Sequence, residues 1–264
     1  MKIYVLAENT ACSGAFGAEH GLSLYIETEG KRLLFDMGQT ALFAENAAKL
    51  GVDLSAVDAA FVSHGHYDHG GGLNTFLSLN TKAPVYLADT AFGNYYNAAG
   101  KYIGLDKSLE KHPRLIKTGE GVTKAMHGIS FTDLNSAIAQ TEIDSAGLTV
   151  LVDDKNVPEV FLHERYLVIE EQGRRIAFSG CAHKGAVNIV NVLRPNIFVG
   201  GFHLSKLETR GDGATRLAQT AHALAAATDL CYTCHCTGVE QYGFLKTVMG
   251  DKLCYLSAGT ILEL

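Results

Sequence analysis

Residues 61–73 constrain this chain more than any other stretch. They read FVSHGHYDHGGGL and place four potential metal ligands within six residues: His64, His66, Asp68 and His69. The apolar residues 59–62 predict a buried strand that ends in a loop, and the three glycines after the ligands let the backbone bend tightly. Imidazole nitrogens and a carboxylate are the donors that a zinc-type ion prefers. We therefore predict that His64 and His66 share one ion and that Asp68 and His69 hold a second. The alternative is a polar loop with satisfied histidines, in which an uncompensated cluster would cost stability.

This HxHxDH loop resembles the signature of the metallo-β-lactamase-fold superfamily. The resemblance implies an α/β fold, an αββα sandwich with metal ions at one edge between its two sheets. An internal repeat agrees with it: residues 165–181 (RYLVIEEQGRRIAFSGC) parallel residues 22–38 (LSLYIETEGKRLLFDMG), and residues 197–203 mirror residues 60–66. One repeat over half the chain predicts two packed β/α halves rather than a solenoid. We expect a single domain over residues 1–264.

The region at about 90–165 is less regular than the rest of the chain. It is long, polar and aromatic, and it lies between the metal loop and the next hairpin of the predicted core. Such an insertion is typical of a lid or a specificity region. The alternative is an ordinary extension of the sandwich.

Four ligands from one loop cannot complete two coordination spheres, so further donors are expected at strand ends. The superfamily resemblance implies a third histidine for the first ion, for which we choose His183, and a final histidine for the second, which His235 matches. Cys181 stands where an aspartate is expected. Its thiolate is a legitimate zinc ligand, so it bridges two ions, binds one ion or only packs.

Three further residues are expected near the ligands. Asp36 resembles the superfamily's early aspartate, which orients a ligand histidine, although a turn carboxylate that accepts backbone N–H bonds is the alternative. His203 mirrors His66 at a strand end, and we expect it to contact the substrate or leaving group and to share catalysis with Asp68. Lys184 precedes a predicted helix at 186–193, where a cation and free backbone N–H groups would suit a phosphate or carboxylate.

The other cysteines and histidines are expected to be structural. A CxxCxC run is formed by Cys231, Cys234 and Cys236, but a strand alternates its side chains, so packing thiols are favoured over a separate zinc site. The histidines without a partner pattern are expected to be surface or core residues: His20, His112, His127, His163 and His222.

Composition limits the partners and the compartment. A formal net charge of −6 argues against a broad nucleic-acid surface, which needs clustered Lys and Arg. The amino terminus has only five apolar residues in a row, too few for a signal peptide, and no apolar run approaches the ~20 residues of a membrane span. We expect a cytoplasmic protein with reduced cysteines that binds neither nucleic acid nor membrane. The sequence does not indicate its oligomeric state.

Four segments together resemble one branch of the superfamily: HGHYDHGGGL, SGCAHKG, GGFHL and HCTG. That branch is described as metal-dependent hydrolases and is related to the archaeal dihydropterin-linked aminobenzene ribofuranosyl phosphate synthase. The resemblance implies two divalent ions, zinc before manganese or iron. We expect a hydrolase that attacks an anionic, for example phosphorylated, small molecule with a metal-activated hydroxide.

Two alternatives to the hydrolase stay open. One is a dihydropterin-pyrophosphate-dependent transferase, in which Tyr95, Tyr96 or Tyr102 would stack on the pterin. The other is a non-catalytic metal or redox sensor that responds to oxidation of Cys181 or Cys234.

Overall fold

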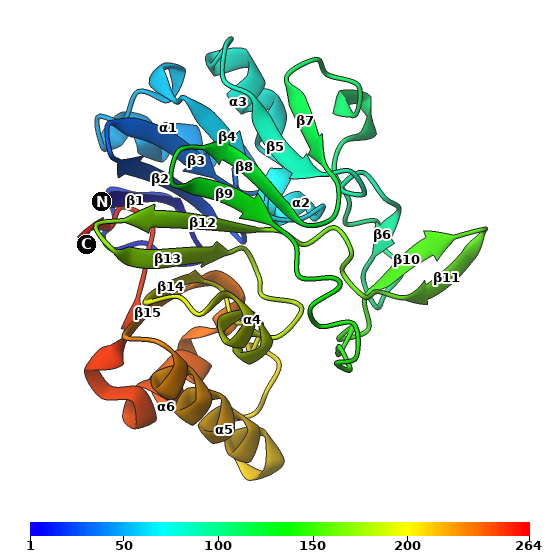
Figure 1. The fold of residues 1–264 in the computed structure, drawn as a ribbon, viewed down its shortest axis with the longest axis vertical. Helices are drawn as coiled ribbons and strands as arrows, with labels where there is room; N and C mark the ends of the chain where they lie inside the picture. Colours follow the sequence, from blue (N-terminus) through cyan, green and yellow to red (C-terminus); the bar gives the residue numbers. More distant parts are fainter.

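The computed structural model describes all 264 residues and contains two seven-stranded sheets that pack face to face (Figure 1). The first sheet has, in spatial order, β17 (Ile261–Glu263), β1 (Lys2–Ala7), β2 (Ser23–Thr28), β3 (Lys31–Phe35), β4 (Ala59–Phe61), β5 (Val85–Ala88) and β7 (Leu115–Thr118). The second has β16 (Leu253–Tyr255), β15 (Leu230–Thr233), β14 (Ile197–Gly200), β13 (Arg174–Ser179), β12 (Tyr166–Glu171), β9 (Ile129–Thr132) and β8 (Val122–Met126).

Helices cover the outer faces of both sheets. Those of the first half are α1 (Leu42–Lys49), α2 (Tyr67–Gly70) and α3 (Leu73–Leu79), and those of the second are α4 (Ala186–Leu193), α5 (Gly211–Ala227) and α6 (Val239–Met249). Four short 3₁₀ turns complete the helical elements: η1 (Leu54–Ala56), η2 (Lys107–Leu109), η3 (His235–Thr237) and η4 (Gly250–Lys252). No helix is both long and apolar enough to cross a membrane.

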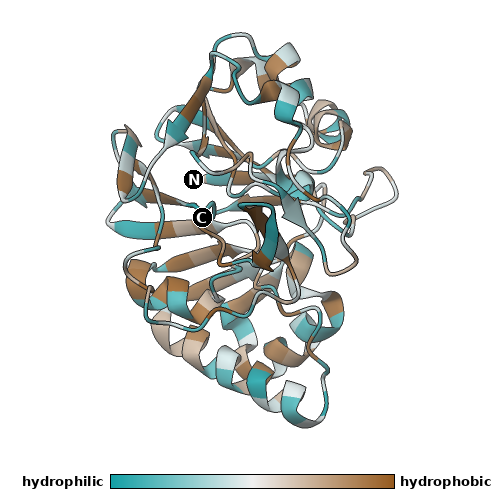
Figure 2. Cartoon of the chain, turned by 90° about the vertical axis from the view of Figure 1, so that its right-hand side faces the viewer, coloured by the Kyte–Doolittle hydropathy of each residue, from teal (hydrophilic) through white to brown (hydrophobic).

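Three apolar layers hold these elements together. Phe35, Phe61, Phe131 and Phe178 are fully buried in the cluster between the two sheets. Two further clusters lie between each sheet and its helices. Because the central strands are buried on both faces, they read as continuous apolar runs, such as the IFVG of β14, and Figure 2 shows apolar segments in the strands and on the helices that pack on them.

This architecture confirms the predicted αββα sandwich, and its halves have the same strand pairing. β2 pairs antiparallel with β3, which continues in parallel through β4 to β5; β12 pairs antiparallel with β13, which continues in parallel through β14 to β15. The carboxyl ends of β3, β4, β13, β14 and β15 therefore gather at one end of the sandwich, where ligands bind in α/β folds.

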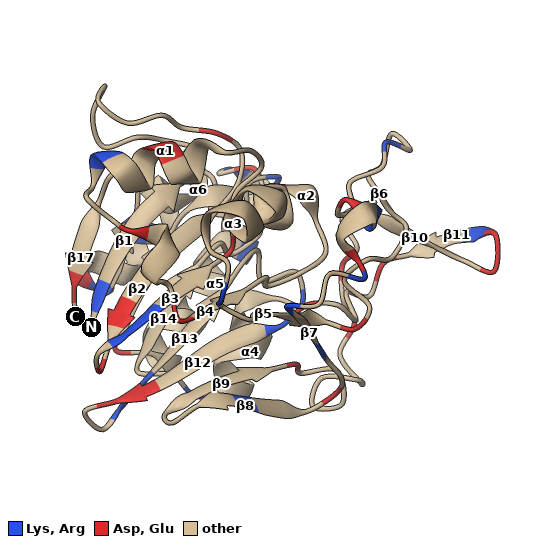
Figure 3. Ribbon diagram, turned by 90° about the horizontal axis from the view of Figure 1, so that it is seen from above, with Lys and Arg blue, Asp and Glu red and all other residues tan.

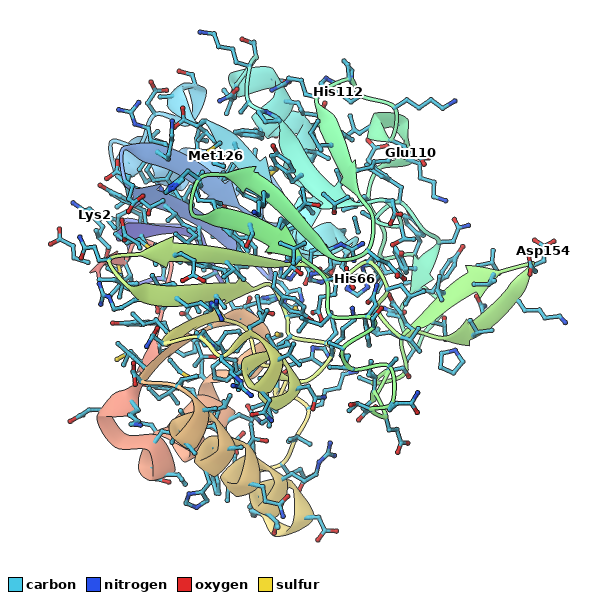
Figure 4. All side chains as sticks on the ribbon, in the orientation of Figure 1. Lys2, His66, Glu110, His112, Met126 and Asp154 are labelled. Carbon is cyan, nitrogen blue, oxygen red and sulfur yellow. The ribbon has the colours of Figure 1, made fainter.

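The region at 90–165 divides into two kinds of structure. β7, β8 and β9 extend the two main sheets, as the alternative interpretation expects. β6 (Tyr95–Tyr96), β10 (Thr149–Val152) and β11 (Lys155–Pro158) form a separate small sheet, and their hairpin projects from the body, with Asp154 at its tip in Figure 4. A lid role for this hairpin remains a prediction.

Charged residues are spread over the molecule. In Figure 3, Lys and Arg alternate with Asp and Glu along the strands, helices and hairpins, and they form no continuous basic stripe. This distribution accords with the net charge of −6.

Candidate metal centre

Two groups of donor side chains converge where the strands end. The first contains His64, His66 and His183, and the second contains Asp68, His69, Cys181 and His235; within each group the ligand atoms lie within 4.8 Å of one another. All are buried. The structure thus brings together all seven residues predicted as ligands, and Figure 4 shows His66 at the ends of the strands.

The second group has the donor chemistry of a divalent cation site. His69 Nε2 lies 3.1 Å from Cys181 Sγ and 3.2 Å from His235 Nε2. The Nδ1 atoms of the two rings face acceptors, Asp36 Oδ2 at 2.7 Å and Asn9 Oδ1 at 2.8 Å, so each Nδ1 carries the proton. The two Nε2 atoms therefore face one another, beside the thiol of Cys181 and the carboxylate of Asp68. A cation fits in the space between these four donors.

A proton on His235 Nε2 competes with a metal ion for this position. Burial lowers the pKa of His235, but the hydrogen bond with Asp68 and the nearby charges of Cys236, Asp68 and Glu8 together outweigh burial and raise the pKa to about 8. Asp68 Oδ2 lies 3.3 Å from His235 Nε2 and 3.7 Å from His69 Nε2. An ion that binds here must displace a proton, as ligand imidazoles generally require.

Two imidazoles of the first group, those of His64 and His183, are held neutral. Burial, reinforced by neighbouring histidines, lowers the pKa of His64 and of His183 well below its usual value. Ser63 Oγ donates to Asp36 and so accepts from His64 Nδ1 at 2.8 Å, which leaves His64 Nε2 unprotonated, 3.3 Å from His183 Nε2. Neutral imidazole is the form that binds metal ions.

Asp36 connects the two groups. It is fully buried directly after β3 and accepts hydrogen bonds from the Ser63 amide, the Ser63 hydroxyl and His69 Nδ1, each at 2.7 Å. A carboxylate that holds the far nitrogen of a ligand histidine fixes the ring's tautomer and direction. Asp36 therefore has both roles considered from the sequence: it orients a ligand histidine, and it accepts a backbone N–H.

The loop itself differs from the prediction. Asp68 and His69 lie in α2, a single helical turn, rather than in an extended loop.

Gly180, directly after β13, packs closely against the metal loop. A Cβ at this position would lie 2.1 Å from Ser63 Oγ and 3.0 Å from His64 Nδ1. Any larger residue there would push the metal loop away from the second sheet.

A cavity of about 470 Å³ opens beside the first group and is lined in part by His183 and His203. The His203 ring lies 4.4 Å from the His183 ring, and neither of its nitrogens has a hydrogen-bond partner in the protein. Its backbone has a φ of 54°, which is strained for a residue other than glycine. His203 thus faces this cavity with a free proton donor or acceptor.

Lys184 also lines this cavity, but its surroundings differ from the prediction. The residue is only 2% exposed, and its Nζ donates to Asn135 Oδ1. Its backbone N–H donates to Glu164, and that of Gly185 to the Ala182 carbonyl. The expectation of free N–H groups at Lys184 and Gly185 was therefore wrong, because Glu164 accepts the first and the Ala182 carbonyl accepts the second.

Sequence reasoning missed three residues that contact the second group. Glu8 accepts the His235 amide at 2.6 Å, and Asn9 accepts from the His235 ring. His20, whose side chain is 55% exposed as expected for a surface histidine, lies 3.2 Å from Asp68 Oδ2, a contact that no sequence pattern indicated. Glu8 and Asn9 follow β1, which runs in the same direction as β3, and polar residues after such a strand were the available signal.

The remaining cysteines and histidines separate into structural and site residues. Cys231 and Cys234 pack in the core, as predicted. Cys236 lies beside the site, where its sulfur accepts the His203 amide at 3.3 Å. His163 contacts the first group and was missed, as was Glu159.

The chain resembles known proteins over most of its length. The sequence model described as the metallo-beta-lactamase superfamily matches residues 16–222. The chain is 28% identical to the 7,8-dihydropterin-6-methyl-4-(beta-D-ribofuranosyl)-aminobenzene-5'-phosphate synthase of Methanocaldococcus jannaschii, over 100% of this chain and 96% of that protein. The crystal structure of Tm1679, described as a metal-dependent hydrolase of the beta-lactamase superfamily, matches with a TM-score of 0.82 and 28% identity, over 100% of this chain and 99% of that one. Zinc-bound PqqB from Methylobacterium extorquens has the same fold, with a TM-score of 0.59 and 12% identity over 100% of both chains.

Proposed function

Because this chain belongs to the metallo-β-lactamase superfamily, whose fold implies divalent metal binding and whose members are largely enzymes, we propose that it is a metal-dependent hydrolase of anionic small molecules. The observation that carries the proposal is the pair of Nε2 atoms of His69 and His235, which face one another at 3.2 Å beside Cys181 and Asp68. In a structural cluster two imidazole nitrogens that both lack a proton would not face one another, because two acceptors have no proton to share.

Seven side chains are proposed to hold two divalent ions, of which zinc is the first choice: His64, His66 and His183 for one, and Asp68, His69, Cys181 and His235 for the other. Bound divalent ions would lower the pKa of water to about 7 and polarise the electrophile. Asp36, Ser63 and Asn9 direct the Nε2 atoms of His69, His64 and His235 toward the ions, because they occupy the opposite ring nitrogens.

Two side chains are proposed to act on the substrate. Asp68 is placed to orient the attacking water, since burial raises its pKa but His69, His20 and His235 together lower it well below the usual range and keep it ionised. His203 is proposed to protonate the leaving group, because its ring faces the cavity with both nitrogens unpaired.

The lining of the cavity supports an anionic substrate. Lys184, Lys206 and Arg216 line it together with the carboxylates of Glu142 and Asp144, so cations outnumber anions. Its volume of about 470 Å³ suits a small molecule rather than a polymer.

The proposal is tested by metal content per chain, measured on protein purified without added metal. We expect two ions in the wild type and one in Cys181→Ala, because Cys181 is proposed to bind only the second ion, although its sulfur also lies within 4.8 Å of the ligand atoms of His183 and His203. The control is Cys12→Ala, which removes an exposed thiol and should leave two ions.

Activity on a panel of phosphoesters and lactones completes the test. No bound metal, and no activity after reconstitution with zinc, manganese or iron, would overturn the proposal. Bound metal without activity on any substrate would favour the sensor alternative.

A second candidate function is the transferase, and the full-length similarity to the archaeal phosphate synthase favours it. A transferase needs two substrates, whereas a hydrolase needs one and water. We therefore expect a hydrolase to release pyrophosphate from a dihydropterin pyrophosphate with no aromatic acceptor present. Release that depends on an aminobenzene ribofuranosyl phosphate, with a joined product by mass spectrometry, would establish the transferase instead.

A further inference from the structure

The segment between β11 and β12 places a buried acid and histidine against the first ligand group. Glu159 and His163 are each 1% exposed. Glu159 Oε2 lies 3.4 Å from His66 Nε2, and Glu159 Oε1 contacts His163 Nε2. A carboxylate without direct contact to water therefore stands between two imidazoles.

The protons in this chain of contacts can be assigned. The Gly65 amide donates to His163 Nδ1 at 2.7 Å, so His163 Nδ1 is an acceptor and its proton sits on Nε2, from which it donates to Glu159. A carboxylate oxygen is an acceptor, so Glu159 accepts from His163 Nε2 through Oε1 and faces His66 Nε2 with Oε2.

The metal loop and this segment are held together at further points. The Arg165 amide donates to the Ser63 carbonyl at 2.7 Å, directly before His64. The Tyr95 ring packs on the His163 ring at 4.1 Å. These contacts fix His163 and Glu159 relative to the loop that carries His66.

We propose that Glu159 and His163 are positioning residues for His66, in which Glu159 holds the Nε2–H of the ring and leaves Nδ1 as the ligand atom. This inference rests on the proposed metal centre. Carboxylates that hold the far nitrogen of a ligand histidine typically change metal affinity 10- to 100-fold when they are removed. The region predicted from the sequence as a lid or specificity insertion therefore also shapes the metal centre.

The alternative role for the same residues is a third metal site, because the ligand atoms of His66, Glu159 and His163 lie within 4.8 Å of one another. The assigned proton on His163 Nε2 points at Glu159 and occupies the position that an ion would need. The positioning role is therefore the one that the hydrogen bonds favour.

The test compares zinc affinity, by chelator competition, in the wild type, Glu159→Gln and Glu159→Asp. We expect Glu159→Gln to bind one of its two ions roughly 10- to 100-fold more weakly and to change the visible spectrum of the cobalt-loaded protein. The conservative Glu159→Asp should restore part of the affinity. Glu110→Gln, an exposed carboxylate of the same region, is the matched control, and circular dichroism shows whether each variant folds.

The outcomes separate this inference from the proposed function. Two ions bound by Glu159→Gln with wild-type affinity and an unchanged cobalt spectrum would overturn the positioning role alone. A third ion in the wild type, lost in Glu159→Gln, would also overturn it, since Glu159 would then be a ligand. A wild type that binds no ion would overturn the metal centre and this inference together. If Glu159→Gln does not fold, His163→Asn is measured in its place.

Discussion

Replacement of Asp68 with Asn is expected to lower the rate of phosphoester hydrolysis by about 10³-fold. The carboxylate of Asp68 lies 3.2 Å from His20 Nε2, 3.3 Å from His235 Nε2 and 3.7 Å from His69 Nε2. Asn has nearly the same shape but no charge, so it would weaken the hold on the second ion and no longer orient water. Such electrostatic stabilisation is worth several kcal/mol, and each ~1.4 kcal/mol is tenfold in rate.

The measurement is kcat/KM for bis(p-nitrophenyl) phosphate, or for the best substrate of the panel, at saturating metal. The control is Asp212→Asn, which makes the same change at an exposed position in the first turn of α5 and should keep wild-type activity. An Asp68→Asn variant within tenfold of the wild type would contradict the role given to this residue.

Replacement of Arg165 with Met is expected to cost about 3–5 kcal/mol of the free energy of unfolding, the cost typical of leaving buried polar groups unpaired. Arg165 is 1% exposed. Its guanidinium donates to the carbonyls of Leu162 and Glu164 in its own segment and to those of Thr118 and Gly119 at the end of β7, at 2.8–3.2 Å. It therefore ties the end of the first sheet to the segment that enters the second, and Met fills the space without satisfying these carbonyls.

Urea unfolding at a fixed zinc concentration measures this cost, because bound metal itself shifts stability. Arg32→Met is the matched control, since Arg32 is exposed on β3 and its side chain makes no hydrogen bond. A midpoint for Arg165→Met equal to that of the control would show that the four carbonyls find other partners.

Local patterns determined much of the fold before the structure was known. The strand β14, the helix α4 after Gly185 and the two hairpins of matching sequence were all expected, because burial on one face leaves a period in the sequence and burial on both faces leaves a continuous apolar run. The metal loop was also visible, since His64, His66, Asp68 and His69 are neighbours in the chain. Only its one-turn helix α2 was missed, because a single turn leaves too few residues for a helical period.

The surroundings of the ligands could not be predicted in the same way. His163 contacts Gly65 across 98 residues of sequence, and Glu8 contacts His235 across 227. No local pattern marks such pairs, so Glu8, Asn9, His20, Glu159 and His163 were overlooked or assigned no role. Lys184 shows the reverse error. The sequence indicated a free backbone N–H at this residue and could not reveal that the Glu164 carboxylate accepts it.

The sequence by itself determined the donor chemistry of the metal loop and the repeat that divides the chain into two halves, because both depend on spacing along the chain. The αββα sandwich and the distant ligands were implied by the family resemblance. Only the tertiary structure decided which strand ends meet, which ring nitrogen of each histidine faces inward and which carboxylates stand behind them. The physical reason is that a hydrogen-bond partner depends on distance in space, and strand order and packing bring together residues that the chain keeps far apart.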